Sequence, residues 1–145
     1  MTMISLDDIQ LMWKEDSKIN IDDLHNESLK VASLHAKYYE MYNNFSLLRK
    51  KSEIDYKQRR LERYNFYAGK ATSETYQEEP FPYKVRDKDG MQKHLDADSK
   101  LSDIFIKIEY YDTILKYLEE IIKMISSRTY QIKNSIDFLR FQSGM

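Results

Sequence analysis

Cysteine is absent from this chain of 145 residues. Its absence excludes disulfide bonds, thiol-based catalysis and metal sites with cysteine ligands, and is consistent with a reducing compartment. The chain also lacks an excess of either charge, because 23 basic residues face 24 acidic ones. Bulk charge therefore indicates no partner, and any nucleic-acid site has to arise from local clustering of basic residues.

Helix-breaking residues are scarce, with three glycines and two prolines, whereas 12 tyrosines bring the aromatic content to 13%. This composition is typical of long helices that bury aromatic stripes. We expect an all-α fold of long helices. The predicted parts are an N-terminal helical arm (1–70), a loop (71–90) and a C-terminal helical region (91–145) with a coiled-coil-like seam that drives homo-oligomerisation.

Long apolar runs are also missing, since no stretch approaches the roughly 18 residues of a membrane span. The first eight residues lack the charged and apolar regions of a signal peptide. We therefore expect a soluble, cytoplasmic protein with no membrane contact.

The N-terminal arm carries two helix-start signals. Ser5, with Asp8 three residues later, predicts the cap of a short first helix, and Asn20 with Asp23 predicts a second cap. No glycine or proline lies between Asn20 and Tyr67, so one continuous helix is predicted there.

The apolar stripe of this helix ends before the helix does. Its regular spacing includes Val31, Leu34, Tyr38, Met41, Phe45 and Leu48, and the next positions are Ser52, Asp55 and Arg59. We therefore expect the second half of the helix to leave the packed region and become solvated. The segment after it holds both prolines and two glycines, which predicts a loop with a short extended piece at Phe81–Val85.

The C-terminal region carries the strongest periodic signal. Eleven of twelve positions at three-four spacing are apolar, which predicts a helical seam between subunits. These positions are Leu101, Ile104, Ile108, Tyr111, Leu115, Leu118, Ile122, Ile125, Thr129, Ile132, Ile136 and Leu139. Ile114 and Ile121 widen the stripe, as in a helix with more than one neighbour, and the polar residues 126–129 indicate a bend or a junction.

A basic and aromatic cluster in the arm is the main functional clue. Between residues 49 and 70, eight basic residues and three acidic ones give a local net charge of +5 in a chain of net charge −1. Basic side chains neutralise phosphates, and tyrosine rings can stack on unpaired bases. The candidate nucleic-acid-binding residues are Arg49, Lys50, Lys51, Lys57, Arg59, Arg60, Arg63, Tyr64, Tyr67 and Lys70.

Two other interpretations of this cluster stay open. A basic helical run is more often a solvated face, and its tyrosines can belong to the core. A basic helix can equally dock an acidic protein, which would make the chain an oligomeric coiled-coil adaptor or structural protein.

No constellation for catalysis or for a metal is present. His25, His35 and His94 lack ligand spacing, and the residues 87–90 begin like a calcium loop without its later ligands, which indicates a turn with a helix cap. Glycine-rich phosphate loops and nucleophile elbows are also missing from the sequence. We expect no enzyme activity, no metal and no cofactor.

Taken together, several segments resemble the UvsY recombination mediator proteins of T4-like phages. The resemblance is best at Ser127–Lys133 and at the tail Arg140–Gly144, and it extends to Leu95–Asp98 with Ile108–Tyr111. Arg63 followed by Phe66–Lys70 is similar to the basic-aromatic segment of the family. Where that family has a lysine two residues before this arginine, the chain has Leu61, and Arg59 and Arg60 lie just upstream.

The resemblance implies a small helical protein that binds single-stranded DNA and does no catalysis. It implies two protein partners, a RecA-type phage recombinase and the phage single-strand-binding protein, in an infected bacterial cell. It also implies a homo-oligomer, a ring or bundle of six or seven subunits. The expected function is to help the recombinase onto DNA that the single-strand-binding protein covers, with each subunit presenting its 49–70 segment to the strand.

Overall fold

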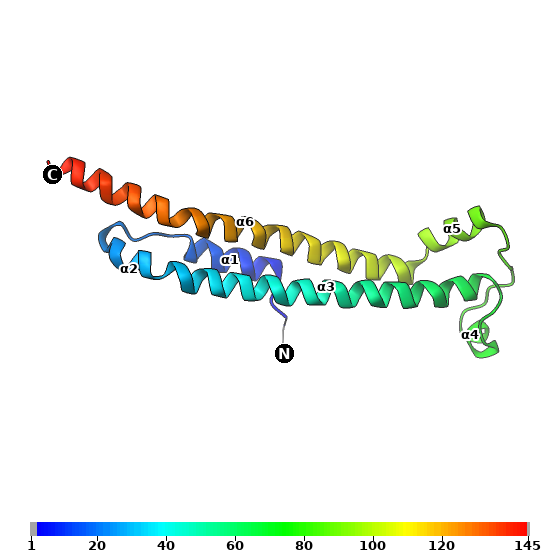
Figure 1. Cartoon of the computed structure of the whole chain (residues 1–145). Coiled ribbons are helices and arrows are strands. Elements are labelled where there is room, and N and C mark those ends of the chain that lie inside the picture. The colour runs from blue at the N-terminus through cyan, green and yellow to red at the C-terminus, as the bar shows by residue number, and fades with distance from the viewer. Residues whose placement is uncertain (1–2, 145) are drawn as a thin grey trace. The chain divides into compact units, whose positions relative to one another are not determined.

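The computed structural model describes residues 3–144, which form helices and no strand. The elements are α1 (Leu6–Asp16), the short 3-10 helix η1 (Ile21–Asp23), α2 (Leu24–Leu29), α3 (Val31–Tyr67), α4 (Ser73–Glu78), α5 (Lys88–Asp96) and α6 (Ser99–Gln142) (Figure 1). The predicted all-α fold of long helices is confirmed. None of the described helices combines the length and the apolar character that crossing a membrane requires.

The chain divides into two compact units, and we describe each by itself. Unit 1 combines Met1–Phe45 with Thr113–Met145, and unit 2 is Ser46–Asp112. Each of the long helices α3 and α6 contributes one part to unit 1 and the other part to unit 2.

In unit 1, α1 begins at the cap that the sequence predicts. The Ser5 hydroxyl accepts a hydrogen bond from the Asp8 N–H (3.1 Å), and the Asp8 carboxylate accepts one from the Ser5 N–H (3.0 Å). The Trp13 ring meets Tyr38 of α3 edge-on at 5.5 Å, and the Tyr38 hydroxyl donates to Asp16 (2.7 Å). These contacts hold α1 against the first part of α3.

The predicted continuous helix from Asn20 to Tyr67 is wrong at its beginning. Asn20 does cap a helix, but that helix is the single turn η1, and α3 begins only at Val31, after α2. The Glu27 side chain of α2 is buried against Arg128 of α6. This tertiary contact fixes the local backbone, and helix propensity does not encode it.

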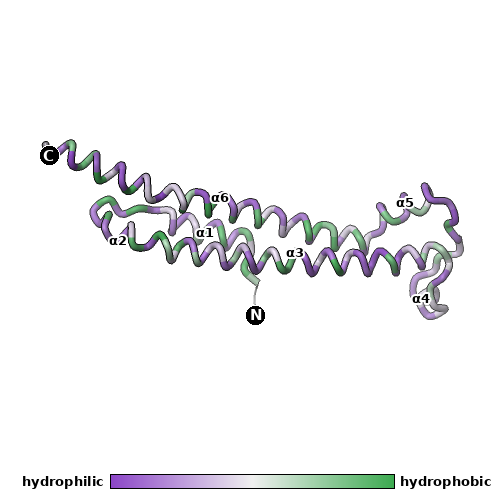
Figure 2. Tube along the Cα trace, in the orientation of Figure 1, coloured by the Kyte–Doolittle hydropathy of each residue, from purple (hydrophilic) through white to green (hydrophobic). Residues whose placement is uncertain are grey.

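The buried stripe of α6 in unit 1 contains the predicted positions Leu118, Ile125 and Ile132, but the positions buried between them differ from the prediction. Ile114, Ile121 and Arg128 are almost fully buried, whereas the predicted positions 115 and 122 are half-buried and Thr129 is exposed. Hydrophobic positions recur along this helix (Figure 2). The two polar serines and Thr129 mark no break, because α6 is continuous to Gln142.

Six of the twelve positions of the predicted oligomerisation seam are buried inside a single chain. The buried members are Leu101, Ile108, Tyr111, Leu118, Ile125 and Ile132. A side chain packed in the core of one chain cannot also form the interface with another copy. We therefore expect an interface between copies to use exposed residues, and the oligomerisation seam stays a prediction.

Unit 2 contains a compact aromatic core in the region predicted to be a loop. The residues 71–90 contain α4 and the first turn of α5, and the Asp87 side chain caps α5 by accepting from the Gly90 N–H (2.8 Å). The core consists of Phe66, Tyr67, Met91, Leu95 and Leu101. No strand forms at residues 81–85 in the described chain, although the Val85 N–H donates to the Tyr67 carbonyl (2.9 Å).

Candidate nucleic-acid interface

The basic segment lies entirely in unit 2, on the second part of α3 and in the turn that follows. That turn reverses the chain at Gly69, whose φ of 79° suits glycine. The Lys70 N–H donates to the Asn65 carbonyl (2.8 Å) and the Gly69 N–H to the Phe66 carbonyl (3.2 Å), as in a Schellman cap. The cap ends α3 at Tyr67, as the sequence predicts, and brings α4 and α5 back beside it.

Arg63, one of the predicted DNA-binding residues, is part of the core of unit 2. Its side chain is 6% exposed, with Nε 2.6 Å from Asp98 Oδ2 and Nη1 2.7 Å from Glu79 Oε2. Its guanidinium also lies over the Phe66 ring, 4.2 Å from the centroid. An arginine held in this way is satisfied by the protein, and a DNA phosphate could reach it only if these bonds broke.

Tyr67 belongs to the same network, which we call the Arg63 network (Arg63, Tyr67, Glu79 and Asp98). The Tyr67 hydroxyl donates to Asp98 Oδ2 (2.6 Å), and the other Asp98 oxygen accepts from the Leu101 N–H at the start of α6 (3.0 Å). Only 8% of Tyr67 is exposed, so its ring is not available for stacking on a base.

The pKa values of the two carboxylates in this network are both lowered. For Asp98, burial alone raises the pKa, but hydrogen bonds from Tyr67, from a backbone N–H and from Arg63 outweigh it. For Glu79, the hydrogen bond from Arg63 is the largest cause of the lowered pKa. Both groups are therefore held as carboxylates, which keeps Arg63 paired.

Arg49 is also neutralised within unit 2. Its guanidinium pairs with Asp112 of α6 and with Glu53 one turn further along α3. The sequence-predicted cluster of eight cations thus contains two arginines whose charges are used inside the protein.

The other predicted residues lie on the solvent side of the segment. Tyr64 is 42% exposed. The exposed cations are Lys50, Lys51, Lys57, Arg59, Arg60 and Lys70. Among them, Arg59 has an exposed ion pair with Glu62 (3.2 Å), which contributes little to stability.

Four of these exposed residues share one side of α3. Lys50, Lys57, Arg60 and Tyr64 follow each other at intervals of seven, three and four residues, which place side chains on the same helix face. The row spans about 20 Å at 1.5 Å per residue. We call this row the outer basic face. Its side chains are exposed, whereas those of Arg63 and Tyr67 are buried.

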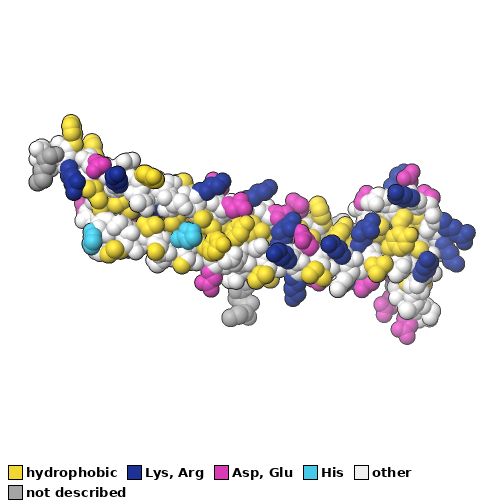
Figure 3. Space-filling view, in the orientation of Figure 1, with side chains coloured by type: hydrophobic (Ala, Val, Ile, Leu, Met, Phe, Trp, Pro, Cys, Tyr) yellow, Lys and Arg dark blue, Asp and Glu magenta, His cyan; other side chains and the backbone are white. Residues whose placement is uncertain are grey.

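Three further cations near this face were not found from the sequence. Lys84, Arg86 and Lys88 are exposed and lie between α4 and the first turn of α5, and Figure 3 shows Lys and Arg side chains gathered at the part of unit 2 that carries α5. The sequence analysis ended the basic cluster at residue 70. The basic residues on either side of Asp87 are visible in the sequence, but only the fold brings their segment beside α3.

Histidine and acidic side chains of residues 3–144 form no metal-holding group. No group of three histidine or acidic side chains there is placed to hold a metal ion. His94 is exposed, and its ring lies 5.1 Å from the Tyr67 ring. The residues 87–90 form a helix cap, as the sequence indicates.

Comparison with known proteins gives a consistent result. The family model described as "Recombination, repair and ssDNA binding protein UvsY" matches residues 12–145. A crystal structure of the recombination mediator protein UvsY of bacteriophage T4 superimposes with a TM-score of 0.83 and 20% sequence identity, over 97% of this chain and 99% of that chain. A second crystal form of the T4 protein gives a TM-score of 0.81 at 20% identity, covering 94% of this chain and 98% of that one. No curated protein sequence matches the chain.

Proposed function

The chain belongs to the UvsY family of recombination, repair and single-stranded-DNA-binding proteins, and from that premise we propose how it carries out this role. It is a recombination mediator that binds single-stranded DNA. We propose that it helps a RecA-type phage recombinase onto DNA covered by single-strand-binding protein. In this proposal it acts by binding and not by catalysis.

The outer basic face of α3 is the observation that carries the proposal. Lys50, Lys57 and Arg60 are exposed and form no ion pair with any described residue. Unpaired cations about one helical turn or more apart can each neutralise a phosphate and release its counterions. The row ends at the exposed ring of Tyr64, which can stack on a base that is not paired.

The rigid support of this face also favours a binding role. The Arg63 network anchors the adjoining side of α3 to the beginning of α6 and to the residue after α4. The exposed cations therefore project from a fixed helix, so less conformational entropy is lost when a strand binds.

We further propose that several copies assemble as a ring or bundle. Repetition of one modest site around an assembly raises avidity without any strong single contact. A strand held at several such sites would be kept in one conformation that a recombinase can take over. The family resemblance suggests six or seven subunits, and the exposed residues of α6 are the proposed interface.

A loading assay tests the mediator role. A RecA-type phage recombinase is mixed with DNA covered by its single-strand-binding protein, and its DNA-dependent ATP hydrolysis is followed with and without this chain. We expect the chain to shorten the lag before hydrolysis. Substitution of Lys57 and Arg60 by alanine should abolish this effect, and an unchanged lag with the unaltered chain would contradict the mediator role.

A further inference from the structure

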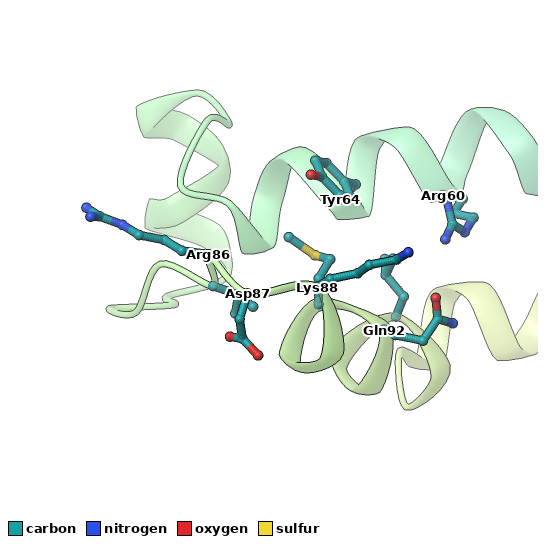
Figure 4. A pocket seen from close by; sticks show the side chains of 9 residues that line it. Arg60, Tyr64, Arg86, Asp87, Lys88 and Gln92 are labelled. Atoms are coloured by element: carbon teal, nitrogen blue, oxygen red, sulfur yellow. The ribbon is translucent and has the colours of Figure 1, made fainter.

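A cavity of about 390 Å³ lies between α3 and α5, beside the outer basic face (Figure 4). Helix α3 contributes Arg60 and Tyr64 to its wall, and α5 contributes Lys88 and Gln92. The volume lies in the range of about 300–1,000 Å³ that is typical of ligand pockets. All of its lining residues belong to unit 2.

The floor of this pocket is apolar and fixed. Met91 and Leu95 are buried members of the core of unit 2, and Val85 packs against that core. The Val85 N–H is also hydrogen-bonded to the Tyr67 carbonyl at the end of α3 (2.9 Å). An apolar surface of this kind suits the face of a nucleobase better than it suits a charged group.

The rim of the pocket is positively charged. No carboxylate of the described chain lies within ion-pairing distance of Arg60 or Lys88. Asp87, the carboxylate in the lining, accepts the Gly90 N–H and points away from Lys88, whose ammonium group points toward Arg60 (Figure 4). Arg86 points away from both. Two cations on one rim, with no acidic partner, favour an anion such as a phosphate.

The Tyr64 ring of α3 forms part of the pocket wall (Figure 4). It is 42% exposed, whereas Phe66 and Tyr67 in the next turn are buried. An exposed ring next to cations is the usual platform on which proteins stack the bases of single strands. Bases of a duplex are paired and stacked on each other, so they cannot enter such a pocket without being flipped out.

We propose that this pocket binds one unstacked base of a DNA strand on Tyr64, with Arg60 and Lys88 on the adjacent phosphates. The inference rests on the proposed single-strand binding and explains why a single strand is preferred to a duplex. The outer basic face attracts any nucleic acid, and the pocket admits a base only from a single strand. Lys88, which the basic segment of the sequence does not include, becomes a DNA-contacting residue.

The stacking step is tested with Tyr64→Leu and, as the matched control, Tyr64→Phe. Each protein is titrated with labelled oligothymidylate and with an abasic deoxyribose-phosphate strand of equal length. We expect the unaltered chain and Tyr64→Phe to prefer oligothymidylate. Tyr64→Leu should weaken oligothymidylate binding at least about five-fold, the low end for removal of a stacking ring, and leave abasic binding unchanged. An unchanged preference in Tyr64→Leu would overturn the proposal.

The phosphate contact is tested with Lys88→Gln, and Lys93→Gln is the control because it removes the same charge from an exposed position of the same helix. Lys88→Gln should weaken binding of both strands and reduce the salt dependence by roughly 0.7 log unit, the value for one lost contact. Equal effects of the two substitutions would mean that only the net charge matters, which contradicts a contact at Lys88.

Photocrosslinking tests the site without any substitution. The unaltered chain is irradiated with an oligonucleotide that carries 5-iododeoxyuridine, and the adducts are located by mass spectrometry. We expect an adduct on Tyr64 or Met91, and adducts confined to other segments would overturn the pocket while leaving single-strand binding in place.

Thymidine monophosphate at the same nucleotide concentration should not displace the strand, and full displacement would identify a site for free nucleotides instead. Absence of all binding would contradict the proposed function itself.

Discussion

Arg60 and Arg63 lie three residues apart on α3 and have opposite surroundings. Arg60 is exposed on the rim of a pocket, whereas Arg63 is buried between two carboxylates. We therefore propose that the same type of side chain serves DNA binding at one position and stability at the other.

Arg60→Ala should weaken single-stranded DNA binding and leave folding unchanged. Loss of one phosphate contact reduces the slope of log affinity against log salt by roughly 0.7. The free energy of unfolding should stay within about 0.5 kcal/mol, because the side chain is exposed. Fluorescence anisotropy across a salt series and urea unfolding measure the two quantities. A loss of stability without a change of slope would show that Arg60 has a structural role.

Asp98→Asn should instead lower the free energy of unfolding, by about 3 kcal/mol. It removes one partner of a buried ion pair in which the two side chains are 6% and 1% exposed, while Glu79 still pairs with Arg63. Urea unfolding followed by circular dichroism measures the loss. Glu62→Gln is the control. It removes the exposed ion-pair partner of Arg59 on α3 and should cost less than about 1 kcal/mol. Equal losses for the two would contradict the assigned importance of burial.

The same network predicts how stability depends on pH. The folded-state pKa values of Asp98 and Glu79 are below their ordinary values, so these charges stabilise the fold above the unfolded pKa values. Their contribution is lost as the pH falls through the folded values. The free energy of unfolding should therefore fall as pH decreases from about 5 toward 3. The fall should be smaller in Asp98→Asn, and an identical pH profile would contradict the network. Asp16 and Glu27, whose pKa values are also lowered, keep some dependence in both proteins.

The sequence could place both arginines in one cluster but could not separate them. Arg63 is distinguished by Asp98, which lies 35 residues away, and by Glu79. Neither carboxylate stands out in the sequence. For the same reason the polar residues 126–129 were interpreted as a bend or a junction, although the Arg128 side chain is buried and paired with Glu27, 101 residues away.

At the level of elements, the end of α3 positions the pocket. Gly69 has a φ of 79°, and a Cβ atom built there would lie 2.8 Å from the Lys84 side chain. Gly69→Ala should therefore lower the free energy of unfolding by about 1 kcal/mol. Gly144→Ala is the control, because it also has a positive φ (77°) but ends the described chain with nothing within 4 Å. Urea unfolding of both proteins tests this, and equal stability of Gly69→Ala and the unaltered chain would contradict it.

Element boundaries show what local sequence determines. The caps at Ser5 and Asp87 and the end of α3 at Tyr67 were predicted correctly, because each depends on residues within a few positions. The helix α4 was missed, because a six-residue helix that packs on an aromatic core carries little local signal. Which apolar positions of α6 are most deeply buried depends on the helices it packs against, so periodicity alone predicted them only in part.

At the level of the whole molecule, the burial of the predicted seam moves the proposed oligomer interface to exposed residues. Phe138, Leu139 and Phe141 near the end of α6 are 59%, 42% and 81% exposed. Apolar side chains grouped in this way mark interaction surfaces more often than isolated ones. We propose that they contribute to the contact between copies.

Phe138→Asp with Phe141→Asp should therefore lower the mass of the assembly without loss of helix content. Sedimentation velocity and circular dichroism measure the two. Ile125→Ala is the contrasting change, since its side chain is fully buried and its loss should cost about 2–5 kcal/mol of unfolding free energy. An assembly of unchanged mass after the two aspartate substitutions would place the interface elsewhere, and a chain that is monomeric at micromolar concentration would contradict the oligomer.

The family and the fold class were within reach of the sequence because they depend on the order of many weak signals along the chain. The proposed DNA-binding surface was only partly within reach. The basic segment was visible, but its division into an outer face and an inner network, and the addition of Lys88, depend on how α5 returns to α3.

Single-stranded DNA binding is the central claim, and one titration tests it most directly. A labelled oligonucleotide is titrated with the chain across a salt series, with an unlabelled duplex of the same length as competitor. We predict binding that weakens steeply with salt and that the duplex displaces poorly. Absence of binding at low salt, or equal displacement by the duplex, would contradict the account.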